Sequence, residues 1–251
     1  MTRHLYLLTG ASRGMGLAIA KQLLSANHFV LCISRNTNEA LASHAAKLGS
    51  PLEQWPLDLE HSVEAAAMLA QWLDNRKTGS FASATLINNA GVMPRIAPLS
   101  ESDPIDLVRA LRVDLETPLL LTAAFLRSTE LWDIPRKVLN ISSGLGRRAM
   151  ASQAGYCAAK AGMDHFTRCL ALDEALKPHG AQVCSLAPGV IDTDMQLQLR
   201  GADASAFPDQ KNFIDLKIND RLTSPTDAAT QVLAYLARPD FGRNPIGDVR
   251  D

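Results

Sequence analysis

The chain has 251 residues, of which 47% are hydrophobic, and a formal net charge of −1. That length and hydrophobic content suit one α/β domain with a sizeable core, so we expect a single domain over residues 1–251. The near-neutral charge without a basic block gives no reason to expect a nucleic-acid or anionic-membrane partner, and no apolar run approaches the roughly 18 residues of a membrane span. We therefore expect a cytoplasmic protein.

The first predicted element is a strand over residues 4–8, which leads through a glycine-rich turn into a helix over residues 17–24. Glycine permits a tight turn and lets the backbone approach a pyrophosphate, whose charge the free N–H groups at the helix start favour. Three residues separate the first two glycines, instead of the one in the common GxGxxG fingerprint. The residues expected to bind a dinucleotide here are Gly10, Ser12, Arg13, Gly14, Met15 and Gly16.

The second predicted strand, residues 29–33, ends in Ser34, Arg35 and Asn36. An NAD-specific site places an Asp or Glu near this point to bind the ribose 2′-hydroxyl, and this chain has neither there. Arg35 and Arg13 can instead bracket a 2′-phosphate, because guanidinium groups match the geometry of phosphate. The sequence therefore favours NADP(H) over NAD(H), and the alternative is that both arginines are merely solvated.

Two more predicted strands bring residues to the same edge of the sheet. Residues 52–57 lead to Asp58 and Leu59, and Asp58 either accepts a hydrogen bond from an adenine amino group or caps the next helix. A buried strand over residues 84–87 is followed by small and amide residues against which a cofactor can lie. These residues are Asn88, Asn89, Ala90 and Gly91.

A strand over residues 137–141 leads to Ser143, and a long helix that follows carries Tyr156 and Lys160. Tyr156 and Lys160 are four residues apart, so they share one face of that helix. An ammonium lowers the pKa of a neighbouring phenol by favouring phenolate, which suits tyrosine to acid-base catalysis near neutral pH. Ser143 is the candidate for holding a carbonyl oxygen beside them.

The last third of the chain contains a further strand over residues 182–186 and a capped helix over residues 225–237. Between them, residues 196–222 lack clear periodicity, and a long connection near ligand-binding strand ends is usually functional. We therefore expect a substrate lid over residues 193–223. Four cysteines without CxxC spacing predict reduced, buried thiols and no metal site. They are Cys32, Cys157, Cys169 and Cys184.

Strands and helices alternate throughout, which predicts an α/β fold with a doubly wound parallel sheet. With these motifs assembled, the chain resembles the short-chain dehydrogenase/reductase family along nearly its whole length. The motifs that carry the resemblance are residues 9–16, Asp58, residues 88–91, Ser143, Tyr156 with Lys160, and Pro188 and Gly189 followed by Thr193.

The resemblance implies a single-domain Rossmann-type sheet of about seven strands and hydride exchange between a nicotinamide and a carbonyl or alcohol. It also implies that Tyr156 is the general acid in reduction, that Lys160 binds the ribose, and that Ser143 holds the substrate oxygen. Thr193 and the Ile191 backbone would hold the nicotinamide carboxamide. Members usually form dimers or tetramers, so we expect a homodimer or homotetramer.

One residue departs from the family pattern. A helical stretch is predicted over residues 103–129, with a kink at Pro118, and where this chain has Asp114 the family usually has an asparagine that helps to hold a water in a proton relay. An aspartate accepts hydrogen bonds but does not donate them, and its charge partly offsets the cation that lowers the pKa of Tyr156. We expect retained activity with a shifted pH optimum.

Within the family, several stretches are similar to the branch that contains sepiapterin reductase and the bacterial benzil (diketone) reductases. That likeness implies that Asp248, near the carboxyl terminus, anchors the amino-pyrimidine edge of a pterin. The alternative is that Asp248 is a surface residue. The function favoured by the sequence is therefore an NADPH-dependent reductase of ketones, vicinal diketones or a pterin side chain. A 3-oxoacyl or sugar-alcohol dehydrogenase, and a non-catalytic NADP(H)-binding regulatory protein, are the alternatives.

Overall fold

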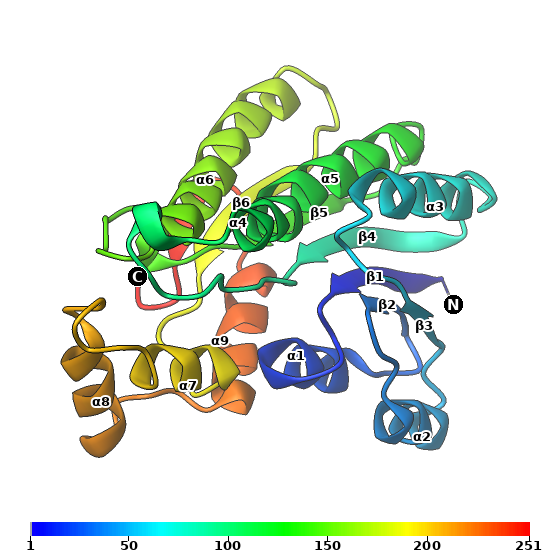
Figure 1. Ribbon diagram of the computed structural model, residues 1–251. Helices are drawn as coiled ribbons and strands as arrows, with labels where there is room; N and C mark the ends of the chain where they lie inside the picture. The colour runs from blue at the N-terminus through cyan, green and yellow to red at the C-terminus, as the bar shows by residue number, and fades with distance from the viewer. Residues whose placement is uncertain (1) are drawn as a thin grey trace.

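The chain forms one sheet of seven strands with helices on both of its faces (Figure 1). The structure, a computed structural model, describes residues 2–251. The strands lie in the order β3-β2-β1-β4-β5-β6-β7, and all neighbours are parallel, which confirms the expected doubly wound α/β fold. Their bounds are β1 Arg3–Thr9, β2 His28–Ser34, β3 Leu52–Pro56, β4 Phe81–Asn88, β5 Arg136–Ile141, β6 Gln182–Ala187 and β7 Ile246–Asp248.

Helices α1, α2 and α9 cover one face of the sheet, and α3, α5 and α6 cover the other. Because both faces are buried, the strands are almost continuously apolar. In β1, for example, Leu5 and Leu7 pack toward α3 and α5, and Leu8 packs toward α1. The helices are α1 Gly14–Leu23, α2 Glu39–Leu48, α3 Ser62–Asp74, α4 Pro104–Leu111, α5 Thr117–Ser128, α6 Ala154–Ala175, α7 Asp194–Arg200, α8 Gln210–Ile218 and α9 Pro225–Ala237.

The order of the strands reverses between β1 and β4. The chain adds β2 and β3 on one side of β1, and it adds β4, β5, β6 and β7 on the other side. The connections that leave β1 and β4 therefore diverge, which opens a crevice at the carboxyl ends of these strands. In α/β sheets this is where ligands bind.

The stretch predicted as one helix over residues 103–129 is interrupted. Between α4 and α5 lies a π-helical turn, Arg112–Glu116, in which the N–H of Thr117 donates to the carbonyl of Arg112. The predicted kink at Pro118 is thus replaced by a wider turn just ahead of that proline. Pro118 has no N–H for the carbonyl four residues earlier, and its ring would crowd that carbonyl in a regular α-helix.

Residues 193–223, for which no regular elements were predicted, contain α7 and α8. These helices lie beyond the carboxyl ends of the strands (Figure 1). They are short, so neither shows enough turns for its periodicity to be recognised in the sequence. Among residues 2–251, no helix is long and apolar enough to cross a membrane.

The prediction that all four cysteines are buried is wrong for two of them. Cys32 and Cys184 are buried in the core, but Cys157 is only half-buried and Cys169 is exposed. Both of these lie on α6, where the cysteine is small enough to occupy the boundary between the core and solvent. All four thiols are free.

Candidate active site

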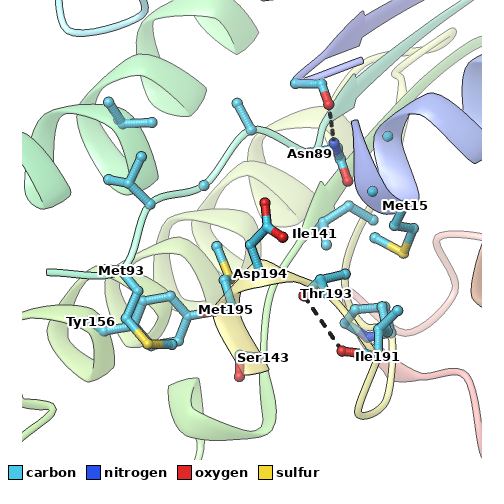
Figure 2. A pocket seen from close by; sticks show the side chains of 18 of the residues that line it. Met15, Asn89, Met93, Ile141, Ser143, Tyr156, Ile191, Thr193, Asp194 and Met195 are labelled. Carbon is cyan, nitrogen blue, oxygen red and sulfur yellow. Dashed lines mark hydrogen bonds between the residues drawn. The ribbon is translucent and has the colours of Figure 1, made fainter. Parts of the chain in front are cut away.

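A cavity of about 570 Å³ lies at the carboxyl ends of the strands (Figure 2). It brings together nearly all the residues selected from the sequence. These are Gly10, Ser12, Arg13, Gly14, Met15, Gly16, Ser34, Arg35, Asp58, Leu59, Asn89, Ala90, Gly91, Ser143, Tyr156, Lys160, Pro188, Gly189, Ile191 and Thr193. Four selected residues, Asn36, Asn88, Asp114 and Asp248, do not line the cavity, and Asn88 is instead buried in the sheet, where its amide donates to Asn140 at 2.8 Å.

The glycine turn between β1 and α1 is held against the end of β4. Gly10 has φ +72°, a backbone conformation that favours glycine, and a Cβ on Gly16 would lie 2.1 Å from the Gly10 carbonyl oxygen. The Asn89 amide donates to the Thr9 carbonyl at 2.9 Å, and the Thr9 hydroxyl accepts from the Asn89 and Ala90 N–H groups. The turn is thereby fixed with the start of α1 facing the cavity, as an anion-binding loop requires.

The ends of β2 and β3 form the part of the cavity next to this turn. Arg35 is exposed and lines the cavity, while the Ser34 hydroxyl donates to the Asn36 carbonyl at 2.9 Å and so shapes the loop. The Asn36 side chain is exposed outside the cavity. Asp58 does not cap α3, which begins after His61, and its carboxylate instead accepts from the N–H of Glu60 at 3.1 Å.

Tyr156 and Lys160 lie in the first two turns of α6, and both side chains are buried. The Lys160 ammonium is 5.6 Å from the centre of the Tyr156 ring and donates to the Ile141 carbonyl at 3.1 Å. Ser143, two residues beyond the end of β5, faces the same space, and its hydroxyl accepts from the N–H of Leu145 at 3.1 Å. A phenol, an ammonium and a hydroxyl therefore meet at one end of the cavity.

Asp114 lies behind these groups, in the π-helical turn. Its carboxylate is 3.4 Å from the Lys160 ammonium and accepts the N–H of Val92 at 2.7 Å. Both charged side chains are almost fully inaccessible to solvent, with exposed fractions of 0% for Asp114 and 4% for Lys160. Asp114 and Lys160 thus form a buried ion pair. Lys160 lines the cavity, whereas Asp114 lies behind it.

Burial and this ion pair control the pKa of Tyr156. Burial raises the pKa of Tyr156, the Lys160 ammonium lowers it, and the Asp114 carboxylate raises it, and together these effects raise the pKa above its ordinary value. The lowering by Lys160 was expected, but the net direction differs because burial outweighs it. For Lys160, burial lowers the pKa but the Asp114 carboxylate reverses this effect, so the net shift is upward. Burial raises the pKa of Asp114, and Lys160 offsets part of that shift.

The other wall of this end of the cavity is apolar and comes partly from the segment 193–223. Tyr156 packs in one cluster with Leu145, Leu199 and Phe213, and Met93 lies against that cluster. Met93, Met195, Ser143 and Tyr156 occupy the same end of the cavity in Figure 2. These apolar residues could not be predicted, because nothing in their spacing along the chain relates them to Tyr156.

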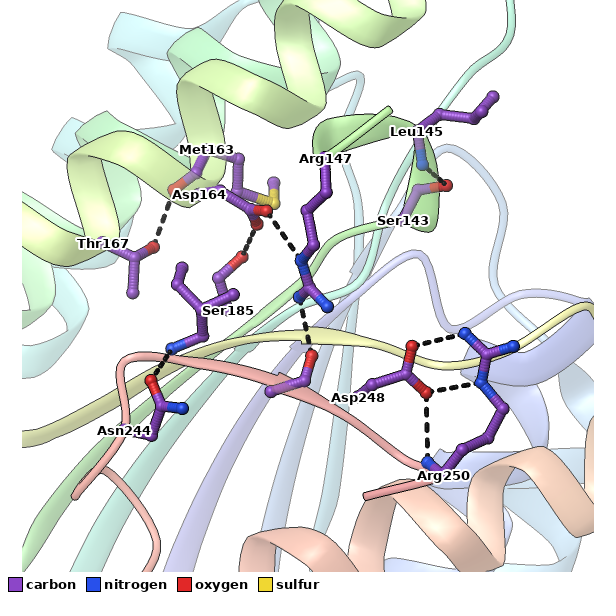
Figure 3. Close-up of polar contacts among 12 residues, drawn as sticks. Ser143, Leu145, Arg147, Met163, Asp164, Thr167, Ser185, Asn244, Asp248 and Arg250 are labelled. Carbon is purple, nitrogen blue, oxygen red and sulfur yellow. Dashed lines mark hydrogen bonds and ion pairs between the residues drawn. The ribbon is translucent and has the colours of Figure 1, made fainter. Parts of the chain in front are cut away.

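Asp248, expected either to anchor a ligand or to be a surface residue, lies in β7 and is buried, so the second alternative is wrong. Its carboxylate accepts from the Arg250 guanidinium at 2.7 Å and 2.6 Å, and only 11% of its side chain is exposed (Figure 3). Arg250, which the sequence analysis did not select, lines the cavity instead. The carboxylate that was expected to bind a guanidine-like ligand edge is therefore already paired with a guanidinium of the chain itself.

Comparisons with known proteins agree with this architecture. The family model described as short chain dehydrogenase matches residues 4–204. The chain belongs to the short-chain dehydrogenase family. Membership makes it an oxidoreductase of a family that uses nicotinamide cofactors, and it accounts for the glycine turn, Ser143, Tyr156 and Lys160 in one cavity.

Among curated relatives of this short-chain dehydrogenase, a benzil reductase ((S)-benzoin forming) of Bacillus cereus is 33% identical, covering 97% of this chain and 96% of the relative. A sepiapterin reductase of Bos taurus is 29% identical, covering 95% of this chain and 91% of the relative. The crystal structure of the KRED1-Pglu enzyme superposes with a TM-score of 0.81 at 26% identity, covering 97% and 99% of the two chains.

Proposed function

We propose that the protein is an NADPH-dependent reductase of ketones and vicinal diketones. The observation that carries this proposal is the convergence of Ser143, Tyr156 and Lys160 on the cavity that the glycine turn also lines. Bound NADPH supplies the hydride to the carbonyl carbon. As the carbonyl π bond breaks, the Tyr156 hydroxyl gives its proton to the carbonyl oxygen, which the Ser143 hydroxyl holds by a hydrogen bond.

The residues of the cavity fit a phosphorylated dinucleotide. The N–H groups at the start of α1 suit the pyrophosphate, and Gly10 and Gly16 leave space that a side chain would fill. In the described residues Arg35 has no ion-pair partner, and no carboxylate follows β2 where NAD-specific sites have one. We infer that Arg35 binds the 2′-phosphate together with Arg13, which would exchange its exposed ion pair with Asp194 for the phosphate, and that this preference makes NADP(H) the cofactor.

The remaining cavity residues receive roles by the same reasoning. Ser12, Gly14 and Met15 complete the pyrophosphate loop, and Ser34 and Asn36 shape the loop that presents Arg35. The residues proposed for the adenosine half are Asp58, Leu59, Asn89, Ala90 and Gly91. Those proposed for the nicotinamide half are Pro188, Gly189, Ile191 and Thr193, together with Tyr156 and Lys160.

A carbonyl flanked by apolar groups suits the substrate end. Leu145, Leu199 and Phe213 form an apolar wall beside Tyr156, and Phe213 stacks on Phe207 with ring centres 5.8 Å apart. Two of these side chains come from the segment 193–223, which we propose to be the substrate lid. The names of the two relatives, benzil reductase and sepiapterin reductase, support a carbonyl beside an aromatic ring.

The test is to follow NADPH oxidation by the purified protein with benzil, 1-phenyl-1,2-propanedione, sepiapterin and an acetoacetyl thioester, and to repeat each assay with NADH. We expect turnover of the diketones with NADPH and much slower turnover with NADH. Preferential turnover of the thioester would instead support a 3-oxoacyl reductase. Tight NADPH binding without turnover of any carbonyl would support a regulatory, non-catalytic role.

We also propose that the protein is a homodimer or homotetramer. Helices α4, α5 and α6 expose several large apolar side chains to solvent in the single chain, including Ile105, Leu172 and Leu176, which are 79%, 71% and 86% exposed. Apolar side chains that gather in one exposed patch mark interaction surfaces, and we propose that these do so between copies of the chain. Size-exclusion chromatography with light scattering will give the mass, and a monomer at all concentrations would refute the proposal.

A further inference from the structure

The charged side chains that line the cavity are unevenly neutralised. Its five arginines are Arg13, Arg35, Arg109, Arg148 and Arg250. Three of them have carboxylate partners: Arg13 pairs with Asp194, Arg109 with Glu60, and Arg250 with Asp248. Within residues 2–251, Arg35 and Arg148 have neither an ion pair nor a side-chain hydrogen bond. The guanidinium groups of Arg35 and Arg148, both exposed, are therefore available to an anionic ligand, and Asp58 is a carboxylate of the same cavity that also has no ion pair within residues 2–251.

These two arginines lie at different ends of the cavity. Arg35 follows β2, beside the glycine turn, where the 2′-phosphate of the cofactor is proposed to bind. Arg148 lies in the loop after β5, between Leu145 and Met150, and both of these neighbours pack in the cluster that contains Tyr156. Arg148 is thus at the substrate end, on the loop that also presents Ser143.

The loop that carries Arg148 is firmly held by the residue before it. The Arg147 guanidinium donates to the Asp164 carboxylate at 3.2 Å and to the Gly247 carbonyl at 2.7 Å, and Asp164 also accepts from Ser185 at 2.6 Å (Figure 3). Arg147 therefore fixes the loop to β6 and β7. Arg148 extends from a fixed backbone, so ligand binding has to order its side chain and not the loop as well.

The neighbouring carboxylates do not neutralise Arg148. Asp114 is committed to Lys160, Asp248 to Arg250, and Asp192 to Lys217 on α8. Arg148 is exposed to solvent, so with a neutral substrate its charge stays hydrated and adds nothing to binding. A carboxylate would balance it and accept two parallel hydrogen bonds from the guanidinium.

We propose, on the basis of the reductase function above, that the substrate is a carbonyl compound bearing a carboxylate, such as an aromatic 2-oxo acid, and that Arg148 binds that carboxylate. The reduction converts such an acid and NADPH, with one proton, into the 2-hydroxy acid and NADP⁺. Arg148 would therefore select an anionic substrate, whereas Asp248 was expected to select a ligand with a guanidine-like edge.

Phenylglyoxylate and 1-phenyl-1,2-propanedione test the proposal, because they share a benzoyl carbonyl and differ in a carboxylate against an acetyl group. We expect the wild type to prefer phenylglyoxylate in kcat/KM. Arg148→Gln should lower the ratio of the two kcat/KM values on the order of 10- to 100-fold, the loss typical of a charge-assisted hydrogen bond, and Arg148→Lys should lower it less. Arg168→Gln, an exposed arginine on α6 outside the cavity, is the matched control.

The outcomes separate this inference from the reductase proposal. An unchanged ratio in Arg148→Gln, or a wild type that reduces the diketone and not phenylglyoxylate, overturns the role of Arg148 while the reductase function stands. A raised KM for NADPH in Arg148→Gln would assign the guanidinium to the cofactor and also overturn it. If the wild type turns over neither compound and none of the carbonyls named above, the reductase proposal fails. Calorimetric binding of phenylglyoxylate to the NADPH-loaded wild type and Arg148→Gln proteins then decides the inference, and equal affinities refute it.

Discussion

Replacing Asp114 with asparagine removes one charge from the buried pair behind Tyr156 and changes little else. The amide keeps an oxygen that can accept the N–H of Val92, which Asp114 now accepts at 2.7 Å. It has the size of the carboxylate, so the π-helical turn around it need not move. The substitution therefore isolates the effect of the negative charge on Lys160 and Tyr156.

The expected loss of stability follows from the distance between the charges. At 3.4 Å and an effective dielectric constant of about 20, the attraction between Asp114 and Lys160 is on the order of 5 kcal/mol before the cost of desolvation. Removal of one member of a buried pair typically costs about 3–5 kcal/mol. Because the Val92 hydrogen bond is retained, we expect the lower figure, which lowers the melting temperature of a chain of this size by about 6–12 °C.

The pH dependence of catalysis should shift in a defined direction. The Asp114 carboxylate raises the pKa of Tyr156 and the pKa of Lys160, so both fall in the asparagine variant. Reduction needs the protonated phenol, and its rate at alkaline pH should therefore begin to fall at a lower pH than in the wild type. Alcohol oxidation needs the phenolate and should begin to rise at a lower pH.

The assay records kcat/KM against pH in both directions for the wild type, Asp114→Asn and the exposed control Asp133→Asn. Thermal unfolding of each protein confirms that the variant is folded at the assay temperature. Superimposable profiles for the wild type and Asp114→Asn would refute the reasoning. So would a shift of both limbs to higher pH, since it would require the carboxylate to lower the pKa of Tyr156.

Three further predictions follow from the geometry of the cavity. Tyr156→Phe should lower kcat for reduction by about 10²- to 10⁴-fold while NADPH binding, measured by its fluorescence, is retained. Arg35→Ala should raise the KM for NADPH on the order of 10- to 100-fold and leave that for NADH unchanged; equal effects on both would contradict the 2′-phosphate assignment. Gly16→Ala places a methyl 2.1 Å from the Gly10 carbonyl oxygen and should lower the free energy of unfolding by about 1–3 kcal/mol, measured by thermal unfolding. Gly144→Ala is the control, because its methyl meets no atom within 4 Å and should leave the free energy of unfolding unchanged.

The parts of the fold and site that the sequence predicts are those determined by local geometry. A strand, a glycine turn and a helix in succession predict the anion-binding loop, because the conformations of Gly10 and Gly16 depend on their immediate neighbours. Tyr156 and Lys160 are related by one helical turn, so their proximity follows once α6 is recognised. The alternation of strands and helices likewise predicts the parallel sheet.

Other features depend on contacts between distant parts of the chain, and the sequence does not reveal them. The π-helical turn at Asp114 replaces a helix that residue propensities alone would continue. Arg148 and Phe213 meet the substrate end only after β5 and the segment 193–223 are brought together, and no spacing rule relates them.

The charges around the cavity connect the cofactor to the proposed substrate. The charge of the buried Lys160 is neutralised by the Asp114 carboxylate, so it is not available to bind an anionic ligand. Of the cavity arginines, Arg35 beside the glycine turn and Arg148 beside Ser143 have no partner within residues 2–251. A ligand that is anionic at each end would pair with both. In the functions proposed above, the 2′-phosphate of NADPH takes the first position and a carboxylate on the carbonyl substrate takes the second.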